Sequence, residues 1–213
     1  HIRIYPLFVS LLVIVASIPF INFLVTWNES MSMPEFMSGI EQWMRNMENQ
    51  ATEMTDAFLK VDTAMGLMVN LLIIGLLAAI GEELLFRGVI LKMFRESVKN
   101  VHLAVFFSAL LFSAFHGQFY GFVPRAVLGV MFGYIFVWTG SLWVPILLHL
   151  LFNSVSVVVA FLFTKGLMDV NYGDFGESSG GWIILLSAFF SVALMVALYQ
   201  RHAKTMINQD RDH

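Results

Sequence analysis

The sequence predicts an all-α protein, a polytopic bundle of about six transmembrane helices with an amphipathic helix between the first two. Of its 213 residues, 58% are hydrophobic and 13% are charged, whereas a soluble domain is typically about 45–50% apolar and about 25% charged. The apolar residues form continuous runs long enough to cross a hydrocarbon core about 30 Å thick. Because backbone groups in lipid must hydrogen bond within their own segment, and because the runs do not alternate as barrel strands do, we expect helices.

Six apolar runs, taken in order, are the predicted spans. They cover residues 7–27, 65–91, 101–116, 123–139, 142–163 and 182–200. The third and fourth are shorter than a usual span. Tryptophans fall near four of the predicted ends, where aromatic residues of membrane proteins concentrate; they are Trp27, Trp138, Trp143 and Trp182. We therefore treat residues 1–213 as a single membrane domain with its core at about 65–163.

Residues 28–64 are predicted to lie outside the membrane. From Met33 to Leu59 apolar residues recur at steps of three and four, with acids and amides between them, which is the pattern of an amphipathic helix. This helix is either a lid over a substrate access route, with methionines providing an adaptable surface, or a connecting helix packed on the bundle. Its few cations make it a poor anchor for anionic lipid.

Charge predicts the topology and excludes several functions. Seven Lys and Arg residues lie on the face that holds both chain ends and four on the opposite face, so the first face is predicted to be cytoplasmic. With a net charge of −3, the chain has no electrostatic attraction to nucleic acid. With no cysteine, the chain has no disulfide, thiolate nucleophile or thiolate metal ligand. Because it begins with His1 rather than Met, we expect residues to precede it in the natural protein.

Three ionisable residues in the second predicted span need an explanation, because a charge at the centre of a transmembrane helix costs about 2.5–3.5 kcal/mol. Glu83 and Arg87 are four residues apart and can pair on one helix face. Glu82 points about 100° away and has no local cation. A buried carboxylate without a cation is a stronger base than an exposed one, which suits a general base. The alternative is a buried ion-pair network that holds helices together.

Two further polar clusters lie in the third and fifth predicted spans. Phe112 and His116 share one helix face, as do His149 and Asn153. Two convergent donors inside a membrane resemble an oxyanion hole, although a satisfied core histidine and an interhelical hydrogen bond are the simpler interpretation. At 1.5 Å per residue, all three clusters fall about 12–22 Å from the cytoplasmic ends of their spans. This shared depth favours one site built from three spans.

The three motifs together resemble the CPBP family, also called the CAAX-protease and bacteriocin-processing or Abi family. They read Glu82-Glu83-Leu-Leu-Phe-Arg87, Phe112-Ser-Ala-Phe-His116 and His149-Leu-Leu-Phe-Asn153, in the family's order. The resemblance covers about residues 65–163, which would be the catalytic core, and implies a metal-free intramembrane glutamic endopeptidase without a cofactor. It implies that Glu82 and His116 activate a water and that His149 and Asn153 stabilise the oxyanion. Glu83, Arg87 and Phe112 would support the site.

The expected partners are the lipid bilayer and a peptide or membrane-associated protein substrate, whether CAAX-like, bacteriocin-like or other. Chain size and the resemblance favour a multi-pass protein of a prokaryotic cytoplasmic membrane. Two alternatives stay open. A metalloprotease could use the same cleft, because two histidines and glutamates can bind zinc, although no HExxH motif is present. A non-catalytic immunity or partner-binding protein, or an ion-coupled carrier, could also place acids and histidines at mid-membrane.

Overall fold

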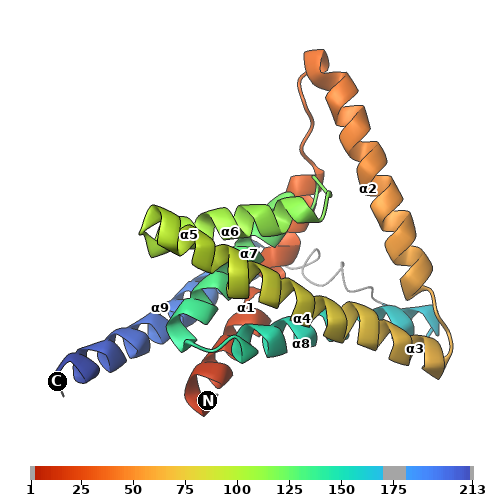
Figure 1. Ribbon diagram of the computed structural model, residues 1–213. Coiled ribbons are helices and arrows are strands. Elements are labelled where there is room, and N and C mark those ends of the chain that lie inside the picture. The colour runs from red at the N-terminus through yellow and green to blue at the C-terminus, as the bar shows by residue number, and fades with distance from the viewer. Residues whose placement is uncertain (1–2, 170–180, 212–213) are drawn as a thin grey trace.

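The computed structural model describes residues 3–169 and 181–211, and within them it consists of helices joined by short connections, with no strand (Figure 1). The helices up to the site are α1 (Ile4–Glu29), η1 (Glu35–Met37), α2 (Ser38–Leu59), α3 (Ala64–Asn70), η2 (Leu71–Leu77), α4 (Ala78–Glu83) and η3 (Leu84–Ile90). They are followed by α5 (Leu91–Val98), α6 (Val101–Phe115), α7 (Phe122–Thr139), α8 (Trp143–Thr164) and α9 (Gly181–Arg211). The segments α3 to α5 form one continuous helix, Ala64–Val98.

The predicted polytopic helical bundle is confirmed. Five helices are long and apolar enough to cross a membrane within the described residues: α1, Ala64–Val98, α7, α8 and most of α9. The sixth predicted span is α6, a shorter apolar helix of 15 residues. Each predicted span thus corresponds to one helix. Most ends agree to within a few residues, but the second and sixth helices continue past the predicted ends, to Val98 and Arg211.

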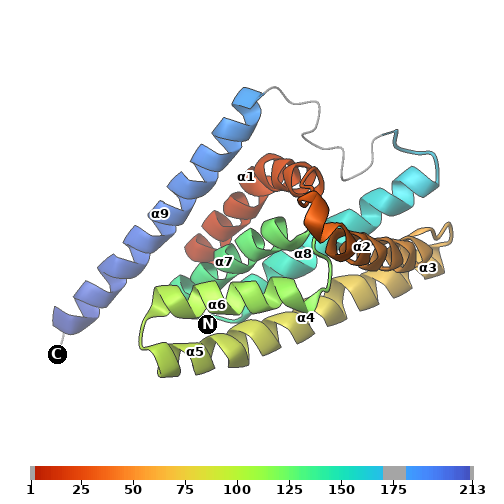
Figure 2. The ribbon, with the colours of Figure 1, turned by 90° about the horizontal axis from the view of Figure 1, so that it is seen from above.

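The helices that carry the three motifs pack side by side. In two perpendicular views α6 lies beside α7, and α8 runs along the α3–α4 part of the long helix (Figures 1 and 2). Helix α9 lies at the edge of the bundle, chiefly along α1 (Figure 2). The largest buried cluster joins residues of α1, α7 and α8, with Leu198 of α9. Packing therefore holds α8, which carries the third motif, against α1 and α7.

Glycines allow the closest of these contacts. A Cβ at Gly129 would lie 3.0 Å from the Cα of Ala109, and one at Gly133 would lie 2.9 Å from Cγ1 of Val105. These two glycines, spaced four apart on α7, let α6 approach closely, as small residues do in membrane helices. The Gly75 Cα similarly faces the Ser154 hydroxyl of α8, which a Cβ would meet at 2.9 Å.

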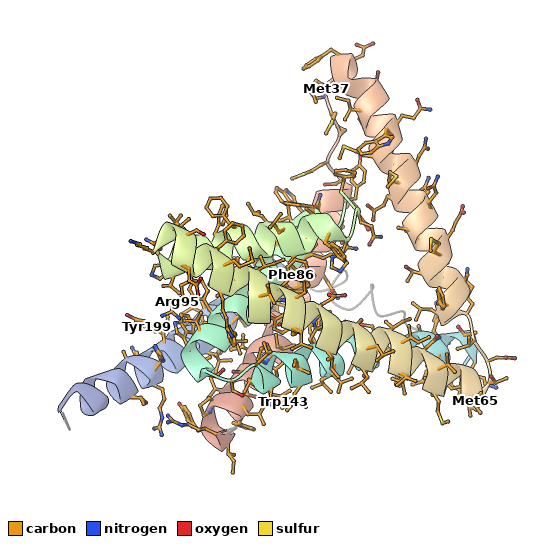
Figure 3. All side chains as sticks on the ribbon, viewed as in Figure 1. Met37, Met65, Phe86, Arg95, Trp143 and Tyr199 are labelled. Carbon is orange, nitrogen blue, oxygen red and sulfur yellow. The ribbon has the colours of Figure 1, made fainter. Side chains whose placement is uncertain are left out.

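The amphipathic segment forms a helix that projects from the bundle (Figure 1). All of α2 lies in the described part of the chain, and none of its residues is buried; Figure 3 shows its side chains projecting on several sides, from Met37 onward. The α-helix begins at Ser38 rather than at Met33, because Pro34 precedes a short 3₁₀ turn. Residues 30–63 therefore form an arm attached at a few points rather than a helix packed along its length, whereas residues 28 and 29 of the predicted segment belong to α1 and residue 64 to α3.

Candidate active site

Both glutamates of the first motif lie in a single α-helical turn between two π-helical segments, η2 and η3. A π-helix has a wider turn than an α-helix, and it leaves some backbone groups free for other partners. The Ile74 carbonyl, in η2, accepts a hydrogen bond of 3.0 Å from Nδ2 of Asn153 on α8. Irregular backbone thus places the glutamates and ties their helix to α8.

Glu83 is fully buried and bridges two other motif residues. Its Oε1 accepts a 2.8 Å bond from Nη1 of Arg87, the contact that their spacing indicates. The same oxygen lies 2.9 Å from Nδ1 of His149. Because an ionised carboxylate only accepts, Nδ1 of His149 carries the proton in this bond. Glu83 therefore fixes both the position and the tautomer of His149.

Arg87 is enclosed, with its side chain 1% exposed. Besides Glu83, its Nη2 donates to the Gly129 carbonyl at 3.0 Å. Its guanidinium carbon lies 4.7 Å from the centre of the Phe112 ring and 5.5 Å from that of Phe132, within the range of cation–π attraction. The arginine thereby joins the long helix to α6 and α7 and neutralises Glu83 inside the bundle.

Phe112 is the aromatic centre of the site. Its ring also lies edge-on to both motif histidines, with centroid separations of 5.1 Å to His116 and 6.2 Å to His149. On the other side of His149, Phe132 stacks parallel to the imidazole at 5.3 Å. These rings leave each histidine little rotational freedom, which matters for any role that needs a fixed ring nitrogen.

Glu82 faces both histidines at the same distance. Its Oε2 lies 3.8 Å from Nε2 of His116 and 3.8 Å from Nε2 of His149. The His116 Nδ1 is bound to the Phe112 carbonyl at 2.9 Å, so this nitrogen also carries a proton. Among the described residues, Oε2 of Glu82 has no hydrogen-bond partner. Three polar atoms therefore converge at a spacing too long for direct hydrogen bonds but suited to one small polar molecule between them.

The site lies near a surface of the bundle rather than in a closed interior. The side chains of Glu82 and His116 are 24% and 26% exposed, whereas that of His149 is 8% exposed. The structure thus brings together Glu82, His116, His149 and Glu83. It places Asn153 on the same helix as His149, with one amide N–H committed to Ile74 and a second N–H remaining.

A polar network around the loop after His116 was not expected from the sequence. Arg125 of α7 donates to the side chain of Gln118 and, at 3.3 Å, to its carbonyl. Gln118 in turn donates at 3.1 Å to Glu48 of α2, which also accepts from the backbone N–H of Tyr120 at 3.1 Å. This network connects the arm to the loop that carries His116. The network also accounts for the glycine at position 121, because a Cβ there would collide with the Arg125 guanidinium.

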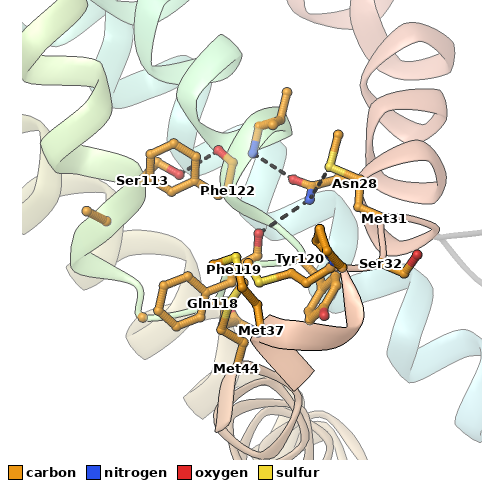
Figure 4. Close-up of a pocket in the computed structure, with 15 residues that line it drawn as sticks. Asn28, Met31, Ser32, Met37, Met44, Ser113, Gln118, Phe119, Tyr120 and Phe122 are labelled. Carbon is orange, nitrogen blue, oxygen red and sulfur yellow. Dashed lines mark hydrogen bonds between the residues drawn. The ribbon is translucent and has the colours of Figure 1, made fainter. Parts of the chain in front are cut away.

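A cavity of about 700 Å³ lies beside this loop, between the end of α1, the start of the arm and the α6–α7 connection (Figure 4). Four methionines line it: Met31, Met33, Met37 and Met44. Asn28 forms one wall and is held there by bonds to the Val123 N–H and the Phe119 carbonyl. Ala114 and Gly117, on either side of His116, also line the cavity. An apolar, adaptable chamber therefore adjoins the segment that carries His116, although the His116 side chain does not line it.

The fold and the site define a class: a multi-pass helical membrane protein with paired carboxylates and histidines gathered inside its bundle. Residues 64–155 match the family model described as type II CAAX prenyl endopeptidase Rce1-like. This match confirms the resemblance drawn from the three motifs, all of which lie within it.

Two curated proteins of Bacillus subtilis are similar to the chain. "Putative membrane peptidase YdiL" is 29% identical over 108 residues, which is 51% of this chain and 43% of that protein. "Uncharacterized protein YpbD" is 28% identical over 90 residues, or 40% of this chain and 43% of that protein. The chain thus spans less than half the length of these relatives. No solved structure matches it.

Within residues 3–169 and 181–211, no group of three or more His, Cys, Asp or Glu side chains is arranged to hold a metal ion. The metalloprotease alternative therefore rests on the residue types of the site and not on a ligand geometry.

Proposed function

We propose that this protein is an intramembrane endopeptidase that hydrolyses a peptide bond with a water activated by Glu82. The observation that carries this proposal is the position of one carboxylate oxygen 3.8 Å from the Nε2 atoms of two histidines. Both histidines are fixed at Nδ1 by hydrogen bonds to other groups. The arrangement brings one acceptor and two imidazoles close enough together to contact the same water molecule.

The proton positions give each group a role. Because His116 donates through Nδ1, its neutral ring presents a lone pair at Nε2, which accepts a hydrogen bond from the water and orients it. Glu82 takes the other proton of the water, and the water oxygen attacks the carbonyl carbon of the peptide while keeping its remaining proton. His149, held through Nδ1 by Glu83, turns Nε2 toward Glu82 and is proposed to supply an N–H there. That N–H donates to the oxyanion as it forms.

The second half of the reaction returns the site to its starting state. The tetrahedral intermediate collapses, its C–N bond breaks, and the proton held by Glu82 passes to the departing nitrogen. The products are a carboxylic acid and an amine, and Glu82 is again a carboxylate. Asn153, through its second amide N–H, is proposed as a further oxyanion donor. Glu83, paired with Arg87, keeps the His149 imidazole in place.

The substrate is proposed to be a peptide or a membrane-associated protein with apolar residues near the cleaved bond. The methionine-lined cavity beside His116 supports this, because methionines adapt to varied apolar shapes. Proteins with CAAX-like termini and peptides with bacteriocin-like leaders are both candidate substrates. The arm α2 reaches the His116 loop through Glu48 and would act as a lid. The relatives' bacterial origin supports a location in a prokaryotic cell membrane.

The proposal is tested by cleavage in liposomes. The purified protein, reconstituted in lipid, is offered internally quenched peptides with apolar carboxyl ends, with and without a prenyl chain, in the presence and absence of EDTA. We expect cleavage that EDTA does not abolish. Replacing His116 or His149 with alanine should lower the rate about 10²- to 10⁴-fold. The control is His102→Ala, which removes an imidazole bonded to Tyr134 outside the site.

Two results would contradict the proposal. Cleavage at an unchanged rate in both the His116→Ala and His149→Ala variants would show that neither histidine takes part in the reaction. Cleavage that is lost with EDTA and restored by zinc would favour the metalloprotease alternative.

A further inference from the structure

A hollow on the predicted cytoplasmic side gathers positive charge away from the candidate active site. It measures about 360 Å³ and lies between the start of α1, the end of α7 and the last described part of α9. Arg3, Arg201 and His202 line it, and none of its described lining residues is acidic. Arg201 lies with its guanidinium 5.0 Å from the centre of the Tyr5 ring. In the described part of the chain these three side chains make no ion pair with a carboxylate.

An apolar groove of about 530 Å³ continues from this hollow between α7 and α9. Trp138 lines both features, and its ring packs on Tyr134 at 4.8 Å and on Tyr199 at 5.5 Å. The α9 residues that line the groove recur at steps of three and four; they are Ala188, Ser191, Val192, Met195, Val196 and Tyr199. The same helix face continues into the hollow with His202 and Thr205. Hollow and groove are therefore two parts of one surface.

The dimensions of this surface match one leaflet of a bilayer. From Ala188 to Tyr199 the helix rises about 16 Å, roughly half of a hydrocarbon core about 30 Å thick. The cations lie one turn farther, at the level of lipid headgroups. Val192 and Val196, in the groove, are 63% and 46% exposed, so the protein leaves their faces open to the membrane.

We propose that α1, α7 and α9 form a binding site for one anionic glycerophospholipid. Its phosphate lies among Arg3, Arg201 and His202, and an acyl chain follows the groove past Trp138. Charge complementarity selects the headgroup, because basic pockets between membrane helices bind anionic lipid. The bound lipid fills the space that α9 leaves against α7 and so attaches this edge helix to the bundle.

Native mass spectrometry of the purified full chain tests this, with phosphatidylglycerol and phosphatidylcholine as matched probes. We expect one phosphatidylglycerol to be retained in preference to phosphatidylcholine. The variant Arg3→Gln with Arg201→Gln should lose about thirtyfold in that preference, at about fivefold for each cation near an anionic surface. The control, Lys92→Gln with Lys204→Gln, removes two cations from the same predicted face without touching the hollow and should change nothing.

Two further arms address folding and the source of the ligand. Arg3→Lys with Arg201→Lys keeps the charge and should keep the preference, and Val192→Trp keeps every cation but fills the groove and should abolish retention. Free glycerol phosphate at the same concentration should not compete. Equal retention of both lipids, an equal loss in the control variant, or competition by glycerol phosphate would overturn the proposal. So would a dimer that Val192→Trp dissociates, because a second copy would then occupy the groove.

Discussion

Replacing Arg87 with methionine should destabilise the folded protein by about 3–5 kcal/mol, the usual cost of removing one partner from a buried ion pair. The structure supports the upper part of this range. The side chain is 1% exposed, its partner Glu83 is fully buried, and the change also removes the hydrogen bond from Nη2 to the Gly129 carbonyl, which contributes about 0.5–1.5 kcal/mol. Methionine has a similar length, so the loss reflects charge and hydrogen bonds rather than a cavity.

A double-mutant cycle isolates the pair. Glu83→Gln alone leaves Arg87 as a buried cation without its counterion, whereas the double variant removes both charges and keeps an oxygen that can accept from His149. We therefore expect the double variant to be more stable than Arg87→Met by about 2 kcal/mol. Reversible unfolding in mixed micelles, followed by circular dichroism, measures each difference. Additive effects of the two changes, or a cost below about 1 kcal/mol for Arg87→Met, would refute this account of the pair.

Three further predictions follow from the described contacts. Gly129→Ala should cost about 1–3 kcal/mol of folding stability, because its Cβ would meet the backbone of Ala109 at 3.0 Å; unfolding in micelles measures it. Gly121→Ala should displace the Arg125 guanidinium and lower cleavage activity without a comparable loss of stability. The hydrogen bond from Arg45, followed by that from the Met33 N–H, holds the pKa of Glu41 below its usual value. This contact is fully present above the unfolded value and is lost as pH falls through the lowered one, so the protection of the Met33 amide, its exchange rate relative to the intrinsic rate at the same pH, should fall only in acid.

The controls for these predictions lie on the arm and in the same assays. Gly39→Ala introduces a methyl group that meets nothing within 4 Å, and it should leave stability unchanged or slightly higher because alanine favours a helix. If Gly129→Ala behaves like Gly39→Ala, the close α6–α7 contact does not limit stability. If Gly121→Ala leaves cleavage intact, the Arg125 network does not position the His116 loop. If the protection of the Met33 amide does not fall in acid, the hydrogen bond to Glu41 does not hold this segment.

The sequence predicted the spans well because hydropathy and length are local properties. Each apolar run became one helix, and the short third run became the short helix α6. The pairing of Glu83 with Arg87 also follows from local spacing. The depth estimate, which needs only the rise per residue, placed Glu82, His116 and His149 in one layer, and the structure brings these three together.

The contacts between helices could not be predicted from the sequence, because they depend on backbone geometry that has no local sequence pattern. Glu82 and Glu83 both reach His149 although neighbouring residues of an α-helix point about 100° apart, because the imidazole turns Nε2 toward Glu82 and Nδ1 toward Glu83. The π-helical segments lie on either side of this pair. The bond from Asn153 to Ile74 depends on one of these segments. Arg125 stood in an apolar run without a motif, and its link to Glu48 crosses 77 positions of sequence through Gln118.

The cleavage rate of Glu82→Gln tests the central claim most directly, because glutamine keeps the shape of the side chain but cannot take a proton from water. Measured in liposomes beside Glu96→Gln, a change to an exposed carboxylate on the same long helix, it should fall about 10²- to 10⁴-fold while the control keeps its rate. Both variants should unfold at the same midpoint as the unchanged protein. A Glu82→Gln protein that folds normally and cleaves at the control rate would contradict the account.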